Sequence, residues 1–239
     1  MGSDFSGKIV LVAGGTGGLG RAVSLAFLEQ GAQVTVTFRH EGELQALKDL
    51  AADRATRLSG FNVDVTDPDQ TAELVKKIVA QWNGLDVLVN TVGGYAGGTP
   101  LWELDPEVFN RMIDLNLRAT YALAKSAVPP MLARKSGAIV NIASKAAWDH
   151  AAGASAYTST KAAAVALIDS LAADLIGTGV RANSILPSII DTEANRKAMP
   201  NADFSKWPKG EDIAQVVLFL SSDSARVIHG ASIPVFGNA

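Results

Sequence analysis

The sequence predicts a three-layer α/β protein in which a doubly wound parallel sheet of about seven strands carries helices on both faces. Short apolar segments rich in Val and Ile alternate with longer helical patterns, which is the order of βαβ units. A glycine-rich turn follows the first apolar segment, where such sheets hold phosphate groups. With 239 residues, 48% apolar and 19% charged, the chain fits a single domain over residues 1–239.

The first half of the chain supplies four expected strands. Residues 8–13 form a continuous apolar run, as in a strand that is buried on both faces. The apolar residues after the glycine turn predict a helix over residues 21–30, which Gly31 ends. Further strands are expected at residues 33–38, 58–65 and 85–90, with helices at 41–52 and 68–82 between them.

The second half continues the alternation. A long helical pattern runs from residue 106 to about residue 133, and the pair Pro129-Pro130 should kink or break it. Strands are expected at residues 138–143, 180–186 and 231–235, with helices at 155–176 and 210–221. Because the strands of right-handed βαβ units run parallel, their carboxyl ends share one edge, where we expect the ligand site.

Charge and cysteine content limit the partners of the chain. A formal net charge of −3 provides no positive field for nucleic acid or an anionic membrane, and no apolar run approaches the roughly 18 residues of a membrane span. We also expect no signal peptide, because the first residues lack a basic and an apolar region. The absence of cysteine suits a cytoplasmic location.

The pair Tyr157 and Lys161 is the first candidate for catalysis. Four residues apart on an expected helix, the two side chains lie on one face. A cation within about 4–6 Å lowers the pKa of a phenol, so the pair predicts a tyrosine that exchanges protons near neutral pH. Ser144 follows the strand expected at residues 138–143 and would place a hydroxyl beside that phenol.

Gly14, Gly18 and Gly20 lie between the first strand and the first helix. Without Cβ atoms the backbone can approach a pyrophosphate closely, and the helix N-terminus offers it free N–H groups. No Lys-Ser/Thr pair follows at Walker A spacing. The turn therefore predicts phosphate binding of another class, with a tight turn chosen for packing as the alternative.

Together, these motifs resemble the classical short-chain dehydrogenase/reductase family over nearly the whole chain. The resemblance implies a Rossmann-type fold and an NAD(P)(H)-dependent oxidoreductase that transfers hydride between nicotinamide and a carbonyl or alcohol substrate. It also implies a catalytic set of Asn116, Ser144, Tyr157 and Lys161. Tyr157 would be the general acid/base, Ser144 would hydrogen-bond the substrate oxygen, and Lys161 would hold the cofactor ribose and lower the pKa of Tyr157. Asn116 would position a water that links Lys161 to solvent.

The resemblance extends to the cofactor contacts, with several departures. Ala13 replaces the threonine of the glycine motif, and Ser188 replaces the glycine of the Pro-Gly motif. The Asn-Asn-Ala-Gly turn of the family falls on residues 90–93, where only the first and last positions agree. The implied cofactor-binding residues are Gly14, Thr16, Gly18, Leu19, Gly20, Arg39, Asp64, Val65, Asn90, Lys161, Pro187, Ile190 and Thr192.

The end of the second expected strand favours NADP(H) over NAD(H). An acidic residue there would accept the ribose hydroxyls of NAD, whereas Phe38-Arg39 offers a guanidinium suited to a 2′-phosphate. Gly17 stands where many NADP-preferring relatives carry a basic residue, so we expect modest selectivity.

Two loops, at residues 93–98 and 191–207, are similar to those of dihydropteridine reductases. In the first, Tyr95 lies between two Gly-Gly pairs and would form a substrate pocket with Ser144 and Tyr157. This likeness implies a quinonoid pterin or another planar heterocycle as an alternative substrate, although those reductases lack the serine that this chain keeps. The second loop suits a lid over the same pocket.

Helices expected near residues 106–125 and 155–176 are rich in Ala and Leu on more than one face. Because relatives commonly pair these helices, we expect a homotetramer that acts on a small-molecule substrate. The alternative of another class is a catalytically silent dinucleotide-binding regulatory protein. A hydrolase triad of Ser144, Asp149 and His150 lacks the glycine-flanked elbow, and the three isolated histidines predict no metal site.

Overall fold

The structure, a computed structural model, describes residues 4–238 and confirms the predicted architecture. Seven strands form one sheet in the order β3-β2-β1-β4-β5-β6-β7, and all neighbouring pairs are parallel. The strands are β1 (Ile9–Ala13), β2 (Gln33–Phe38), β3 (Leu58–Asn62), β4 (Val87–Asn90), β5 (Gly137–Ile142), β6 (Val180–Pro187) and β7 (Ser232–Val235).

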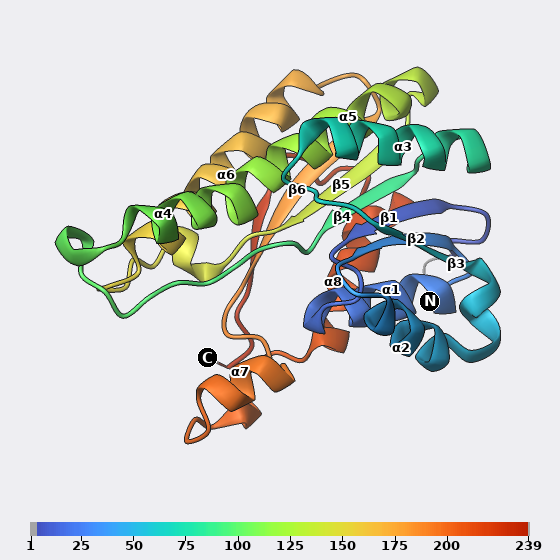
Figure 1. Cartoon of the computed structure of the whole chain (residues 1–239). Helices are drawn as coiled ribbons and strands as arrows, with labels where there is room; N and C mark the ends of the chain where they lie inside the picture. Colours follow the sequence, from blue (N-terminus) through green and yellow to red (C-terminus); the bar gives the residue numbers. More distant parts are fainter. Residues whose placement is uncertain (1–3, 239) are drawn as a thin grey trace.

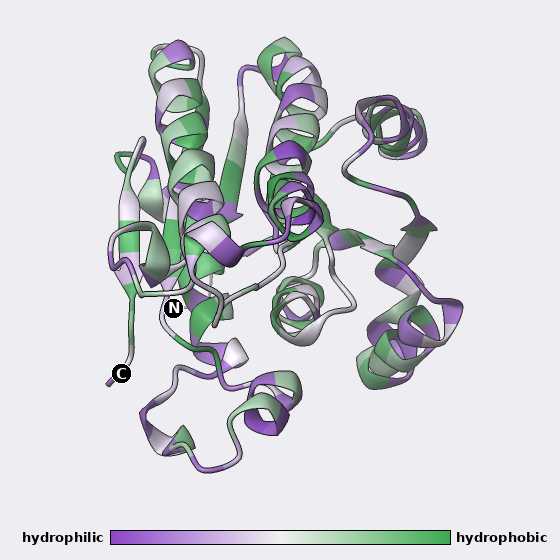
Figure 2. Cartoon of the chain, turned by 60° about the vertical axis from the view of Figure 1, so that its left-hand side comes forward, coloured by the Kyte–Doolittle hydropathy of each residue, from purple (hydrophilic) through white to green (hydrophobic). Residues whose placement is uncertain are grey.

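Helices cover both faces of the sheet (Figure 1), and an apolar core lies on each face. One core packs α1 (Gly18–Glu29), α2 (Glu41–Ala51) and α8 (Gly210–Ser221) against the strands. The other packs α3 (Pro68–Trp82), α5 (Ala119–Arg134) and α6 (Ser155–Asp174). In β1, Val10 and Val12 enter the first core while Leu11 enters the second, which explains why this strand is apolar throughout. Figure 2 shows hydrophobic residues on the strands and mixed character along the helices.

The long helix expected from residue 106 divides at a different place from the one predicted. It consists of α4 (Pro106–Met112), a π-helical turn (Ile113–Arg118) and α5, which continues through Pro129 and Pro130. The prolines do not break α5, because their fixed φ suits a helix and the neighbouring Ala127 and Met131 are held in the core. The interruption falls instead on the π-helical turn, a feature often found at functional sites.

Two further boundaries differ by three residues from the sequence-based expectation. The strand expected at residues 58–65 ends at Asn62, because Asn62 pairs with Phe38, the last residue of β2. The helix expected from residue 21 begins already at Gly18. Within residues 4–238, no helix is long and apolar enough to cross a membrane.

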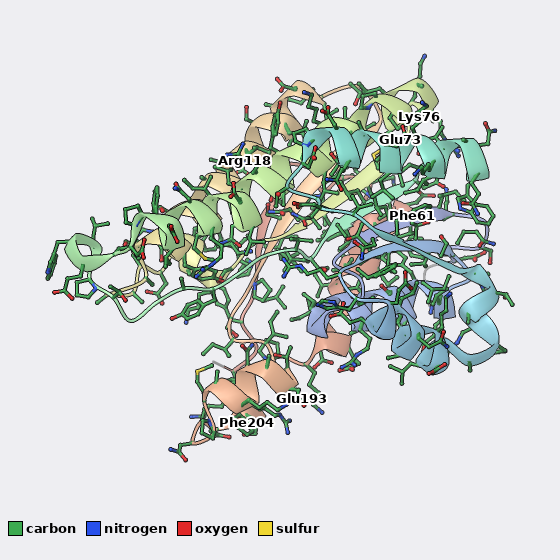
Figure 3. The ribbon with its side chains drawn as sticks, in the orientation of Figure 1. Phe61, Glu73, Lys76, Arg118, Glu193 and Phe204 are labelled. Atoms are coloured by element: carbon green, nitrogen blue, oxygen red, sulfur yellow. The ribbon has the colours of Figure 1, made fainter. Side chains whose placement is uncertain are left out.

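The segment after β6 stands apart from the sheet. Residues 193–207, which we call the lid segment, contain α7 (Glu193–Ala198) and a short 3-10 turn (Phe204–Lys206). Figure 3 shows Glu193 and Phe204 on this segment, below the main body of the molecule in the view of Figure 1. The base of the segment is closed by a bridge between Asp191 and Lys209.

Candidate active site

Two pockets of about 640 Å³ each lie at the carboxyl edge of the sheet, where the strand order turns back between β1 and β4. The first is lined by the glycine turn, the end of β2 and the loops after β3 and β4. The second is lined by the start of α1 and the loop after β6. A pocket of about 680 Å³ lies at the opposite edge, but none of the predicted site residues lines it. The predicted cofactor-binding residues therefore favour the two pockets at the carboxyl edge as the ligand site.

The glycine turn permits a close backbone approach and also meets packing demands of its own. Gly14 has a φ of +73°, which L side chains rarely adopt, and its N–H donates to Thr37 Oγ1 at 2.8 Å. A side chain at Gly20 would collide with the Gly14 carbonyl, and one at Gly18 would lie 3.0 Å from Thr192. Because α1 begins at Gly18, its first-turn N–H groups have no partner within the helix and can bind an anion.

The far end of the first pocket carries charges of both signs. The pocket is lined by these predicted cofactor-binding residues: Gly14, Thr16, Arg39, Asp64 and Val65. The Asp64 carboxylate also accepts from the N–H and the hydroxyl of Thr66, at 2.9 and 2.7 Å, and so shapes the local turn. Glu43 lines the same pocket and accepts from the Thr16 hydroxyl at 3.0 Å. Sequence reasoning did not identify Glu43, whose only signal is its place in the first turn of the helix after β2.

The loop after β4 is tied to the glycine turn. Asn90 Oδ1 accepts from the Val92 N–H at 3.1 Å, and its Nδ2 donates to side chains of α5 and β5. Thr91, at a position where the family pattern is lost, donates its hydroxyl to Ala13 O at 2.7 Å or Gly14 O at 3.1 Å. The departure from the pattern thus introduces a contact that the sequence did not predict.

Asn116 lies in the π-helical turn and is 1% exposed. Its Oδ1 accepts from the Gly94 N–H at 3.0 Å, and its Nδ2 donates to Gly94 O at 3.1 Å and to Thr160 Oγ1 at 3.2 Å. This amide therefore holds the backbone of the loop after β4 and joins it to α6, the helix that carries Tyr157 and Lys161.

Tyr157, Ser144 and Lys161 meet between α6 and the end of β5. Burial raises the pKa of the half-buried Tyr157 phenol above its usual 10, while the nearby Ser144 hydroxyl acts to lower it. The Lys161 Nζ donates to Ile142 O at 3.1 Å, and burial lowers the pKa of its ammonium to about 8. The predicted lowering of the Tyr157 pKa by Lys161 is therefore wrong for this structure. Loss of solvent around the phenol dominates its pKa, and Lys161 directs its ammonium to a backbone carbonyl.

The ring of Tyr95 packs edge-on against that of Tyr157. The ring centroids are 5.0 Å apart and the planes meet at 72°, while Tyr95 remains 72% exposed. A side chain at Gly97 would collide with the Tyr95 hydroxyl, so this glycine leaves room for the ring in its observed position. The loop thus brings an exposed aromatic ring to the candidate acid.

The loop after β6 closes the second pocket. Pro187 ends β6, and Ile190 and Thr192 line the pocket opposite the start of α1. Thr192 Oγ1 accepts from the Asn195 N–H at 3.2 Å and so begins α7. The Ser188 hydroxyl donates to Phe236 O at 2.7 Å.

The rival chemistries find little support in the geometry. The Asp149 Oδ2 atom lies 3.9 Å from Lys145 Nζ, and His150 is exposed. This arrangement is unlike a hydrolase triad. Among residues 4–238, no group of three or more His, Cys, Asp or Glu side chains could hold a metal ion.

Residues 8–203 match the family model described as short chain dehydrogenase. One relative, the 3-oxoacyl-[acyl-carrier-protein] reductase of Thermotoga maritima, is 29% identical over 97% of each chain. Another, the cis-4-hydroxycyclohexanecarboxylate dehydrogenase of Sinomonas cyclohexanicum, is 31% identical over 99% of this chain and 98% of its own.

Solved structures are similar over almost the full length of the chain. ElxO with NADP bound superposes with a TM-score of 0.91 and 31% identity, covering 96% of this chain and 97% of its own. A short-chain type dehydrogenase/reductase from Mycobacterium ulcerans has a TM-score of 0.92 and 30% identity. The match covers 98% of this chain and 90% of that protein's chain.

Proposed function

The chain belongs to the short-chain dehydrogenase/reductase family and is an NAD(P)-dependent oxidoreductase of carbonyl and alcohol groups; from this premise we propose that Tyr157 is its general acid/base. The observation that carries the proposal is the meeting of Tyr157, Ser144 and a buried lysine at the carboxyl end of β5. A side chain at Gly93 would lie 3.0 Å from Lys161 Nζ, and Gly93 lines the first pocket. The lysine therefore borders the proposed cofactor site.

Each residue of the set has a definite task. A nicotinamide dinucleotide, when bound, supplies or accepts the hydride. Tyr157 donates its proton to the substrate oxygen as negative charge develops there, and the Ser144 hydroxyl donates a hydrogen bond to the same oxygen. Lys161 would hold the ribose of the bound cofactor, and Asn116 fixes the Gly94 backbone through two hydrogen bonds.

The raised pKa of Tyr157 concerns the protonation state of the proposed acid. A phenol with a pKa above 10 keeps its proton at neutral pH and can donate it. Oxidation of an alcohol needs the phenolate instead. Because the pKa is raised, oxidation should therefore require a higher pH than reduction.

The test is removal of the phenolic hydroxyl. Tyr157→Phe should lower kcat at least about a hundredfold, the usual scale of general acid catalysis, with little change in cofactor Kd. Tyr121→Phe is the matched control, because Tyr121 also has a lysine four residues later but lies 44% exposed on α5. Retention of most activity in Tyr157→Phe, measured by nicotinamide absorbance, would exclude the proposed role. Dinucleotide-dependent partner binding without turnover on a broad ketone panel would favour the regulatory alternative.

NADP(H) is the proposed cofactor, and two observations support it. Arg39 lines the first pocket at the end of β2, where a guanidinium can pair with a 2′-phosphate. ElxO, at 31% identity, has a solved structure with NADP bound. Glu43 in the same pocket opposes this preference, so the preference should be modest.

The proposed substrate is a small carbonyl compound with a planar part that rests on Tyr95. The exposed ring against Tyr157 supports this proposal, since flat groups stack on aromatic side chains. The names of two relatives give 3-oxoacyl-[acyl-carrier-protein] and cis-4-hydroxycyclohexanecarboxylate as their substrates, so a panel should contain these classes beside quinonoid pterins. We also propose a homotetramer, in which the apolar faces of α4 and α5 are covered.

A further inference from the structure

The C-terminal tail, residues 236–238, contacts the turn that carries Ser144. Phe236 packs against a small apolar cluster that includes Ala143 and Ala147, which flank this turn. Lys145, the neighbour of Ser144, places its Nζ 5.3 Å from the centre of the Phe236 ring, within the range of a cation–π interaction. The Phe236 ring therefore packs against the turn that carries Ser144.

The same tail is held by a serine where the family pattern has glycine. The Ser188 N–H donates to Val235 O at 3.3 Å, which any residue with an N–H could do. The Ser188 hydroxyl donates to Phe236 O at 2.7 Å, a bond that glycine cannot make. Ser188 thereby ties the loop after β6 to the tail.

The tail also reaches the lid segment. The Asn238 N–H donates to Lys206 O at 3.2 Å. Gly237 has a φ of +62°, and a side chain there would lie 3.2 Å from Lys206 O and from Pro208. The Asp191 N–H donates to Pro208 O at 2.9 Å, so the tail and the Asp191–Lys209 bridge together hold the base of the lid segment.

From these contacts we infer that Ser188 and the tail form a latch that positions the lid segment and the loop at residues 188–192 relative to the Ser144 turn. Ser188 is a positioning residue, since its hydroxyl is occupied by Phe236 O and acts through the tail. The inference rests on the proposed function, because it assigns importance to the surroundings of Ser144 and Tyr157.

Loss of the latch is tested with Ser188→Ala in the full-length enzyme. Trypsin can cut the lid segment after Arg196, Lys197 or Lys206. Removal of one hydrogen bond should speed this cleavage about fivefold and raise KM for the carbonyl substrate by a similar factor, with kcat changed less than about twofold. Ser188→Thr, which keeps the hydroxyl, should restore both values. Deletion of residues 237–239 should have a similar effect and should add little to Ser188→Ala, because both changes break one connection.

The matched control is Ser222→Ala, which removes a hydroxyl that donates to Phe219 O at 2.8 Å beside the pocket at the opposite edge. Unchanged cleavage and KM in Ser188→Ala, or equal effects in Ser222→Ala, would overturn the inference. If Ser188→Ala does not fold, the tail deletion carries the test with the same outcomes. The trypsin readout needs no turnover, so a failure of the latch is recognised separately from a failure of Tyr157→Phe.

Discussion

Two Tyr-x-x-x-Lys pairs occur in the chain, and only their surroundings distinguish them. Tyr121 is 44% exposed, and Lys125 Nζ lies 5.5 Å from its ring centre. Lys161, by contrast, is 6% exposed and bonded to a backbone carbonyl. The Tyr-x-x-x-Lys spacing alone therefore does not identify the catalytic tyrosine. The strand that precedes Tyr157 and the nearby Ser144 distinguish it from Tyr121. The sequence could not predict the direction of the Tyr157 pKa shift, because desolvation depends on packing between segments far apart in the chain.

The buried ammonium of Lys161 predicts a pH-dependent stability. Its pKa in the folded protein is about 8 against 10.5 for the free side chain. Between these values the unfolded chain binds more protons than the folded one, so stability rises with pH across this window. Below pH 8 the charged form costs the folded state on the order of 3 kcal/mol.

Urea unfolding at pH 7 and pH 10 checks this expectation. The wild type should gain stability relative to Lys161→Met as the pH rises, whatever the difference between the two at pH 7. Lys135→Met, at an exposed position, serves as the control and should show no such relative change. An equal pH dependence in wild type and Lys161→Met would show that Lys161 titrates normally.

Cofactor choice should depend on the opposed charges of Arg39 and Glu43. A bound 2′-phosphate would meet one guanidinium and one carboxylate in this pocket. Glu43→Gln should therefore lower KM for NADPH about two- to fivefold, the value of one nearby like charge removed. KM for NADH should change little. Arg39→Asp should shift the preference toward NADH.

Glu41→Gln is the matched control for this pair, since Glu41 lies in the same first turn of α2 but does not line the pocket. Steady-state kinetics with both cofactors decide the matter. Equal or better efficiency with NADH in the wild type, unchanged in Arg39→Asp, contradicts the NADP(H) preference.

At the scale of elements, capping residues mark some helix boundaries in the sequence. The π-helical turn has no comparable mark. Asp67 accepts from two first-turn N–H groups of α3, and Pro68 follows it as the first helical residue, an arrangement typical of a helix start. The π-helical turn around Asn116 has no such local signal, and the Asn116 side chain bonds to Gly94 and Thr160 in other elements. The resemblance identified Asn116, but its hold on the loop after β4 emerges only from the folded chain.

The loop that carries Tyr95 predicts a selective effect on substrate binding. Tyr95→Ala should raise KM several-fold for planar substrates, because stacking contributes roughly 0.5–1.5 kcal/mol beyond burial, and should change KM little for small aliphatic ketones. Tyr95→Phe keeps the ring and should retain the wild-type pattern. A uniform rise in KM for both substrate types would mean that the ring only supports Tyr157.

At the scale of the whole molecule, alternating apolar segments were enough to predict seven parallel strands and two covered faces. The Ala- and Leu-rich patterns at residues 106–125 and 155–176 also predicted apolar residues on more than one helix face, but not which side chains remain exposed. Phe109, Tyr121 and Leu132 on α4 and α5 are 38%, 44% and 38% exposed. Apolar residues are spread around α5 and α6 instead of forming one stripe, which indicates burial on a second side.

The proposed tetramer follows from this second apolar side. Light scattering at micromolar concentration should give four times the 24.9 kDa chain mass. Leu132→Glu places a charge on the outer side of α5 and should yield smaller species with unchanged circular dichroism, because a buried unpaired charge is costly. Leu50→Glu makes the same change at a 51% exposed position on α2, across the sheet, and should leave the mass at the tetramer value. A wild-type monomer, or equal dissociation in both variants, would show that these helices face solvent and that Tyr157 acts within a single chain.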